Sequence, residues 1–192
     1  MEEQNNLPSG VKKTLIMNKL NGIDNQANEV YLKIYLASIA EAYSLLKEAE
    51  LLYNNKFFQR AYFLGISALE EISKSQMAAD VFTGFIKEDE FKKAYRDHQK
   101  KISRIKWIKI DGNSFPFFSY DNVLIENFDF QKKIKSMYVD IDFDLNEIST
   151  PNDSITENDA KSIVKAVKIG LYRIYQVTEE FGEQIGTKVF MK

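Results

Sequence analysis

The feature that most constrains the fold is a segment, from about Phe57 to Phe82, that is apolar on more than one side when read as a helix. Its apolar residues are Phe58, Ala61, Leu64, Ala68, Leu69 and Ile72 on one side, and Phe63, Ile66 and Met77 on others. A helix that is apolar all round is usually buried. Gly65 and Ala68 would let another helix approach it closely. The segment is therefore predicted to be the central helix of the fold.

Other segments show the same helical spacing of apolar residues. We expect helices over about 26–53, from a cap at Asp89 to about Ile108, over about 122–137, and from a capping box formed by Ser154 and Glu157 to about Gln184. Short links and no persuasive pair of strands predict an all-α bundle of about five helices. The domain is expected to span residues 26–185, between an N-terminal extension (1–25) and a short tail (186–192).

Two segments do not fit the helical pattern. Residues 111–118 are rich in turn formers yet contain Phe115, Phe117 and Phe118, which are expected to pack against the bundle or a partner, with base stacking as the alternative. Residues 138–144 alternate apolar and acidic side chains, a pattern that also suits a strand or an acidic metal site. No second strand is evident and the glycine of an EF-hand is missing. We therefore expect an extended acidic and aromatic segment near 138–150 that lies over the bundle.

Composition excludes several kinds of site. The chain has 192 residues, of which 44% are hydrophobic, as expected for one folded domain. It has no cysteine and one histidine, so disulfides, thiolate metal sites and His-rich zinc sites are excluded, and no metal or cofactor is expected. No apolar run approaches the roughly twenty residues of a membrane span, and the N-terminus lacks signal-peptide features. We expect a cytoplasmic protein without a membrane partner.

The charge balance gives little support to general nucleic-acid binding. The formal net charge is −2, so contact with RNA would need a local patch, and DNA is not expected as a partner. The candidate patch consists of Lys92, Lys93, Arg96, Lys100, Lys101, Arg104, Lys106 and Lys109. A solvated helix face explains the same residues at least as well.

Two short groups of polar residues form the candidate site. Glu70, Glu71 and Lys74 are spaced so that one ammonium could be shared by two carboxylates, and Arg96, His98 and Lys101 follow some twenty residues later. If the two helices pack side by side, these groups converge, and an imidazole there could act as an acid or base. Surface helices carry the same spacings merely to stay solvated. Carboxylates in so apolar a helix nevertheless need partners.

These residues also carry a family resemblance. The order Ala61, Ala68-Leu69-Glu70-Glu71-x-x-Lys74, Arg96-Asp97-His98-x-x-Lys101, Met137-Tyr138-Val139-Asp140, Pro151 and Ala160 resembles the AbiV family of abortive infection proteins, over about residues 27–173. The resemblance implies a HEPN-like bundle that dimerises, in a superfamily with many metal-independent ribonucleases of phage defence. It further implies that the protein stops phage multiplication by shutting down translation. Glu70, Glu71, Lys74, Arg96, His98 and Lys101 would be the functional cluster, and Tyr138 and Asp140 a second, structural motif.

The spacing of Arg96 and His98 departs from that of HEPN ribonucleases, in which several residues separate the arginine from the histidine. Residues two apart point to different sides of a helix. Two hypotheses follow. In one, a homodimer cleaves RNA at a composite site, where His98 is the acid or base, Arg96 and Lys101 hold the phosphate, and Glu70 and Glu71 orient Lys74. In the other, the protein is a non-catalytic effector that binds a phage-encoded protein or a host protein of translation.

Overall fold

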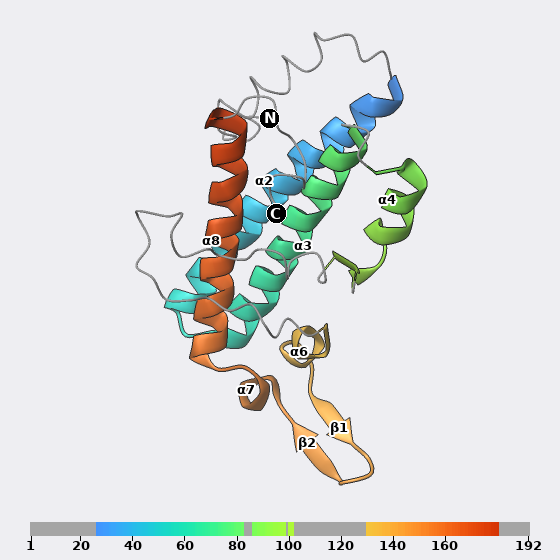
Figure 1. Ribbon diagram of the computed structural model, residues 1–192. Helices are drawn as coiled ribbons and strands as arrows, with labels where there is room; N and C mark the ends of the chain where they lie inside the picture. Colours follow the sequence, from blue (N-terminus) through green and yellow to red (C-terminus); the bar gives the residue numbers. More distant parts are fainter. Residues whose placement is uncertain (1–25, 83–85, 99, 102–129, 181–192) are drawn as a thin grey trace, which may run out of the picture.

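The computed structural model describes residues 26–82, 86–98, 100–101 and 130–180 (Figure 1). Its three long helices are α2 (Gln26–Asn54), α3 (Phe58–Phe82) and α8 (Glu157–Glu180). The shorter elements are α4 (Glu88–Tyr95), α6 (Phe130–Lys135) and α7 (Pro151–Ser154), with two strands, β1 (Asp140–Asp142) and β2 (Glu147–Ser149). The described residues thus form six helices and one small hairpin, which confirms the predicted all-α bundle.

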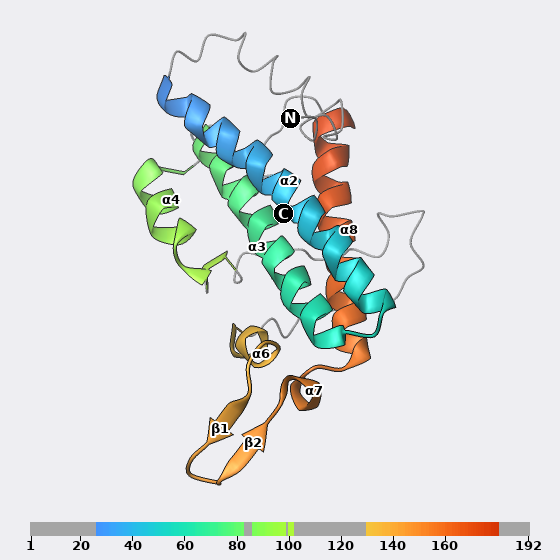
Figure 2. The same cartoon turned by 180° about the vertical axis from the view of Figure 1, so that it is seen from behind.

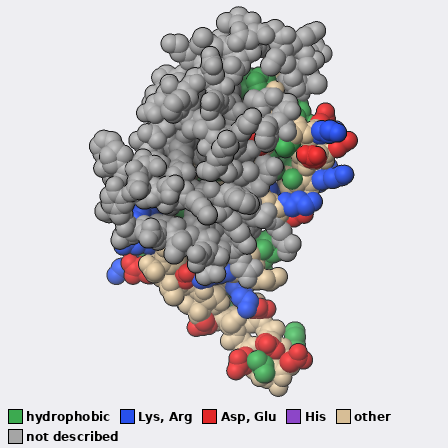
Figure 3. Space-filling view, in the orientation of Figure 1, with side chains coloured by type: hydrophobic (Ala, Val, Ile, Leu, Met, Phe, Trp, Pro, Cys, Tyr) green, Lys and Arg blue, Asp and Glu red, His purple; other side chains and the backbone are tan. Residues whose placement is uncertain are grey.

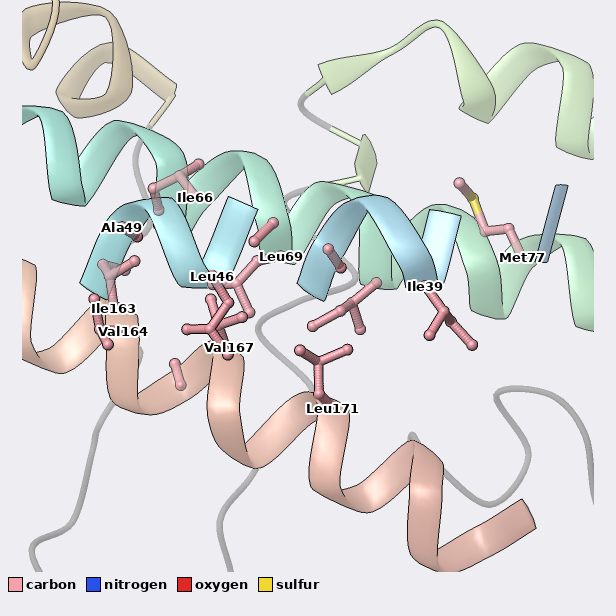
Figure 4. Close-up of a cluster of buried hydrophobic side chains, with 14 of the residues drawn as sticks. Ile39, Leu46, Ala49, Ile66, Leu69, Met77, Ile163, Val164, Val167 and Leu171 are labelled. Atoms are coloured by element: carbon pink, nitrogen blue, oxygen red, sulfur yellow. The ribbon is translucent and has the colours of Figure 1, made fainter. Parts of the chain in front are cut away.

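The core lies where α2, α3 and α8 meet. Figures 1 and 2 show α2 and α3 running side by side with α8 across them, while α4 flanks α3 on the side away from α8. Side chains from all three long helices point toward one another in Figure 4, among them Leu46, Leu69 and Val167, which are at most 7% exposed. Most residues of α3 from Ala61 onward are buried. The prediction that this helix is the central one is confirmed.

Gly65 is a point of close approach between α3 and α8. A Cβ atom at this position would lie 2.1 Å from Cγ2 of Ile163, well inside van der Waals contact. Only glycine fits against an isoleucine whose β-branched side chain has little rotamer freedom. The prediction that Gly65 allows another helix to approach is therefore confirmed.

The predicted capping box at Ser154 and Glu157 is wrong. The chain forms two boxes instead, one at each end of the link into α8. Thr150 pairs with Asp153 at the start of α7. The backbone N–H and hydroxyl of Thr156 donate to Asp159 Oδ2 at 2.9 and 2.7 Å, at the start of α8. A threonine followed by an aspartate three residues later occurs twice in this link, and each pair starts a helix. The first pair starts the single turn of α7, so the last helix begins after the second pair, at Glu157.

The predicted third helix is interrupted, which is a second correction. α4 ends at Tyr95, and Arg96 is its C-cap. Asp97 then caps a new helical turn, since its Oδ1 accepts the backbone N–H of Lys100 at 3.1 Å. Residues 98, 100 and 101 are helical again. Arg96 therefore does not share a helix with His98 or Lys100.

A third correction concerns residues 138–149, for which the sequence predicts an extended segment without a second strand. β1 and β2 pair antiparallel, with Ile141 opposite Ile148. Asp142 Oδ1 accepts the N–H groups of Asp144 and Leu145, both at 3.0 Å, and Asn146 adopts a positive φ of 51°. These hydrogen bonds and the positive φ form the turn between the two strands. Each strand has only three residues, so the alternation of apolar and polar side chains is too short to identify β2 from the sequence. Figures 1 and 2 show the hairpin extending away from the bundle beyond α6.

Several predictions lie outside the described residues. They are the extension (1–25), the remainder of the third helix to Ile108, the aromatic loop at 111–118, the first part of the fourth helix, the end of the last helix near Gln184, and the tail (186–192). Arg104, Lys106 and Lys109 of the candidate basic patch lie there too. The domain boundaries stay predictions. The described part of the fourth helix ends at Lys135.

Candidate functional site

The candidate site is organised around the carboxylate of Glu70, in the middle of α3. Its Oε1 lies 2.7 Å from Nζ of Lys133 on α6. Its Oε2 lies 2.8 Å from Nδ1 of His98 and 3.5 Å from Nζ of Lys101, both on the helical turn that follows α4. One carboxylate thus joins three segments that are far apart in the sequence. We call Glu70, His98, Lys101 and Lys133 the Glu70 cluster.

The Glu70 cluster is largely excluded from water. Glu70, Lys101 and Lys133 are 4%, 6% and 7% exposed. Burial alone would raise the pKa of Glu70. The hydrogen bond and charge of Lys133, the hydrogen bond of His98 and the charge of Lys101 outweigh it, and hold the pKa of Glu70 below its ordinary value. The ammonium of Lys133 also lies 5.2 Å from the centroid of the Phe63 ring, a further attraction for a buried cation.

His98 is the member of the Glu70 cluster that reaches solvent. Its side chain is 52% exposed, and its ring lies 5.9 Å from that of Phe130, measured between centroids. Because Nδ1 faces Glu70, Nε2 is the ring nitrogen that remains for other chemistry. A carboxylate that accepts from Nδ1 fixes the orientation and tautomer of an imidazole, which suits an acid or base.

The other predicted site residues lie beside the Glu70 cluster or elsewhere. Lys74 bonds Glu71 within α3 and lies 5.4 Å from the centroid of the Tyr95 ring, so the two glutamates take different partners. Arg96 is exposed at the end of α4. Tyr138 is 62% exposed, and Asp140 lies on β1 with its Oδ2 3.5 Å from Nζ of Lys135.

Lys133 is the one cluster residue that the sequence analysis missed. It lies three residues after Phe130 and four before Met137, so it falls on the same side of the chain as these apolar residues when the segment is read as a helix. A lysine on an apolar helix face signals a buried counter-charge. The signal is weak in this sequence, because Lys132 and Lys135 lie beside Lys133 and give the segment the composition of a solvent-exposed helix.

The lowered pKa of Glu70 predicts a stability difference that depends on pH. In the unfolded chain a glutamate titrates at about 4.3. A lowered pKa in the folded state means that the ionised carboxylate stabilises the fold fully above that value, and that this contribution is lost as pH falls through the folded-state pKa. The stability advantage of the native protein over Glu70→Gln should therefore be constant just above about pH 5 and shrink at lower pH. Urea unfolding at several pH values measures it, and a difference that does not change below about pH 5 would contradict the assignment.

The fold and the Glu70 cluster define the class of the protein as an all-α bundle with a polar cluster on its central helix. The HEPN_AbiV family model, described as AbiV, matches residues 30–171, and the chain belongs to the AbiV family. Membership implies a role in abortive infection, a form of anti-phage defence. No curated protein and no solved structure matches the chain.

Two absences among the described residues bear on the site. No helix among them combines the length and apolar character that crossing a bilayer requires. Within the same residues, no three or more His, Cys, Asp or Glu side chains are grouped so that they could hold a metal ion.

Proposed function

We propose that this protein halts phage multiplication by blocking translation in the cytoplasm of the infected cell, and that it acts through a phage-encoded protein or a host protein of translation. Membership of the AbiV family supports the defence role. The contacts of the Glu70 cluster support action through a protein rather than through RNA cleavage.

The supporting observation is the burial of two cations. Lys101 and Lys133 are at most 7% exposed, and both lie against Glu70. A phosphate-binding lysine needs an ammonium that the ligand can reach, whereas these two neutralise a carboxylate inside the protein. The Glu70 cluster therefore serves best as an internal ion network, which attaches α6 and the turn after α4 to the central helix.

A metal-independent ribonuclease is the second candidate, and the geometry of His98 favours it. The ring is half exposed, and Glu70 holds its Nδ1, which leaves Nε2 for proton transfer. Because each chain has one histidine, acid and base would have to come from two chains, at a composite site in a homodimer. The exposed Arg96 would then be a cation available to a phosphate.

Phage plating on cells that express the native protein or His98→Ala separates the two candidates. We expect the native protein to reduce plating and the incorporation of labelled amino acids after infection, and His98→Ala to protect as well. We also expect the purified protein to leave RNA intact. Removing a general acid or base slows a reaction by about 10²–10⁴-fold, so a ribonuclease could not tolerate this change.

Lys100→Ala is the matched control, because Lys100 is exposed on the same helical turn as His98. The soluble amount of each variant is measured in the same cells. Loss of protection in His98→Ala alone, at normal protein level and with cuts in the RNA of infected cells, would support the ribonuclease and contradict the proposed function.

A further inference from the structure

We propose that the hairpin formed by residues 138–149 is the surface on which this protein binds its protein partner, and that the partner presents a basic groove with an apolar floor. The inference rests on the proposed function, since it assigns a place to the partner that the function requires. It depends on the exposure, the charge and the attachment of the hairpin.

Every large apolar side chain of the hairpin is exposed. These side chains are Tyr138, Val139, Ile141, Phe143, Leu145 and Ile148, with exposed fractions between 47% and 82%. Phe143, in the loop between the strands, is the most exposed of them. So many apolar side chains on a narrow two-stranded ribbon leave contiguous apolar surface in water, and such surface is typical of interaction sites. Large aromatic residues commonly anchor these interfaces.

The two strands separate apolar from acidic side chains. Side chains alternate between the faces of a strand, and Ile141 is paired with Ile148 while Asp142 is paired with Glu147. The isoleucines therefore share one face, and the paired carboxylates, with Asp140, share the other. A partner that covers the apolar face would have the carboxylates of the hairpin near the edge of the interface. A groove with an apolar floor and cationic walls therefore fits the hairpin.

Charge decides which class of partner fits. Residues 138–149 contain four carboxylates and no lysine or arginine: Asp140, Asp142, Asp144 and Glu147. Figure 3 shows hydrophobic and acidic side chains together on the part of the molecule that extends beyond the rest. An acidic ribbon repels RNA phosphates and anionic lipid, and attracts a cationic protein surface. It also repels a second copy of itself, because an edge-to-edge pair would bring like charges together.

The hairpin is presented by a helix that polar contacts hold in place. Lys132 on α6 lies 2.7 Å from Asp159 at the start of α8, and Lys133 binds Glu70. Arg60 on α3 donates from Nη1 to the carbonyl of Met137, at 3.1 Å, just before the hairpin begins. The chain on the N-terminal side of the hairpin is thus fixed to both α3 and α8. An element held in its binding orientation loses less entropy when it binds.

A photo-crosslinking residue at position 143 tests the proposal in the full chain. Benzoylphenylalanine replaces Phe143 in one variant and Phe57, which is 56% exposed at the start of α3, in a matched control. Infected cells are irradiated and the adducts are identified by mass spectrometry. We expect an adduct specific to position 143, with a protein whose crosslinked surface is basic.

Binding of that identified and purified protein is then measured with two hairpin variants. Ile141→Thr/Ile148→Thr removes the apolar face but keeps β-branched residues. Asp140→Asn/Asp142→Asn removes charge, while the amide oxygen introduced at position 142 can still accept the turn N–H groups. We expect each pair to weaken binding by about tenfold or more, and added salt to weaken binding of the native protein. Phe57→Thr should bind as the native protein does.

Four outcomes would overturn the inference: no adduct specific to position 143, an adduct with a second copy of the chain, an adduct with RNA, or binding that both hairpin variants leave unchanged. Phage plating distinguishes this failure from failure of the proposed function. If the native protein gives no protection, the function fails. If the native protein and Ile141→Thr/Ile148→Thr protect equally, the function stands and only the hairpin assignment fails.

Discussion

Glu70→Ala is expected to lower the free energy of unfolding by about 3–5 kcal/mol, the cost of breaking a buried ion pair by removing one partner. The substitution leaves Lys101 and Lys133 buried without the carboxylate that neutralises them. Both ammonium groups must then return to water, which detaches α6 and the turn after α4 from α3, or remain uncompensated in the interior, and either response costs free energy. Urea unfolding followed by circular dichroism gives the change in free energy.

Glu71→Ala is the matched control for that experiment. Glu71 is the adjacent residue on the same helix, and it pairs with Lys74 one turn away. Pairs at this spacing on a helix contribute only about 0.2–0.5 kcal/mol, and Lys74 retains access to solvent. Equal losses for the two alanine variants would mean that the Glu70 cluster is not a buried network.

The double variant Glu70→Gln/Lys133→Met separates the unpaired charge from the lost contacts. Removing both partners of a buried pair costs less than removing one, because no isolated charge remains between them. We expect the double variant to be more stable than Glu70→Gln alone, though not native-like, since Lys101 keeps its charge. A double variant that is less stable than both single variants would contradict this account.

Gly65→Val is expected to lower the free energy of unfolding by an amount toward the upper end of about 1–3 kcal/mol, the usual cost of overpacking. A Cβ atom at this position would lie 2.1 Å from Cγ2 of Ile163, and valine adds two more methyl groups. Both residues are buried, so α3 and α8 must separate to relieve the clash. Thermal and urea unfolding measure the loss.

The partner across the contact provides the control. Ile163→Ala removes the methyl group that the new side chain would meet, so the cost of Gly65→Val should be much smaller in that background. The coupling energy between the two substitutions should lie within the range of about 0.5–3 kcal/mol seen for residues in contact. Additive effects would show that α8 does not pack against α3 through this pair.

The helices that bury apolar faces were predictable from the sequence. The spacing of large apolar residues identified the central helix, and Gly65 among them pointed to a close helix contact that the structure contains. Partner choice inside the candidate site was less predictable. The spacing along the helix predicted that Glu70 and Glu71 share Lys74. The buried carboxylate of Glu70 instead pairs with residues of other segments, and the spacing along one helix contains no information about those segments.

The elements that hydrophobic spacing mispredicts share one physical property: they are short and depend on single side-chain contacts. Asp97 stops the helix expected to continue past Tyr95 by capping a new turn. Asp142 and Asn146 shape a hairpin whose strands are too short to leave a period. Thr156, rather than Ser154, caps the last helix, because Asp159 completes its capping box. One hydrogen bond decides where each of these short elements begins or ends, and the spacing of apolar residues does not reveal such a bond.

The two oxygens of Glu70 have a consequence for communication within the molecule. One oxygen binds Lys133, on the helix that leads into the hairpin, and the other binds His98. Rotation of that carboxylate cannot improve one bond without weakening the other. The helix that leads into the hairpin and the imidazole of His98 are therefore joined through one carboxylate, so a displacement of Lys133 changes the surroundings of His98 as well.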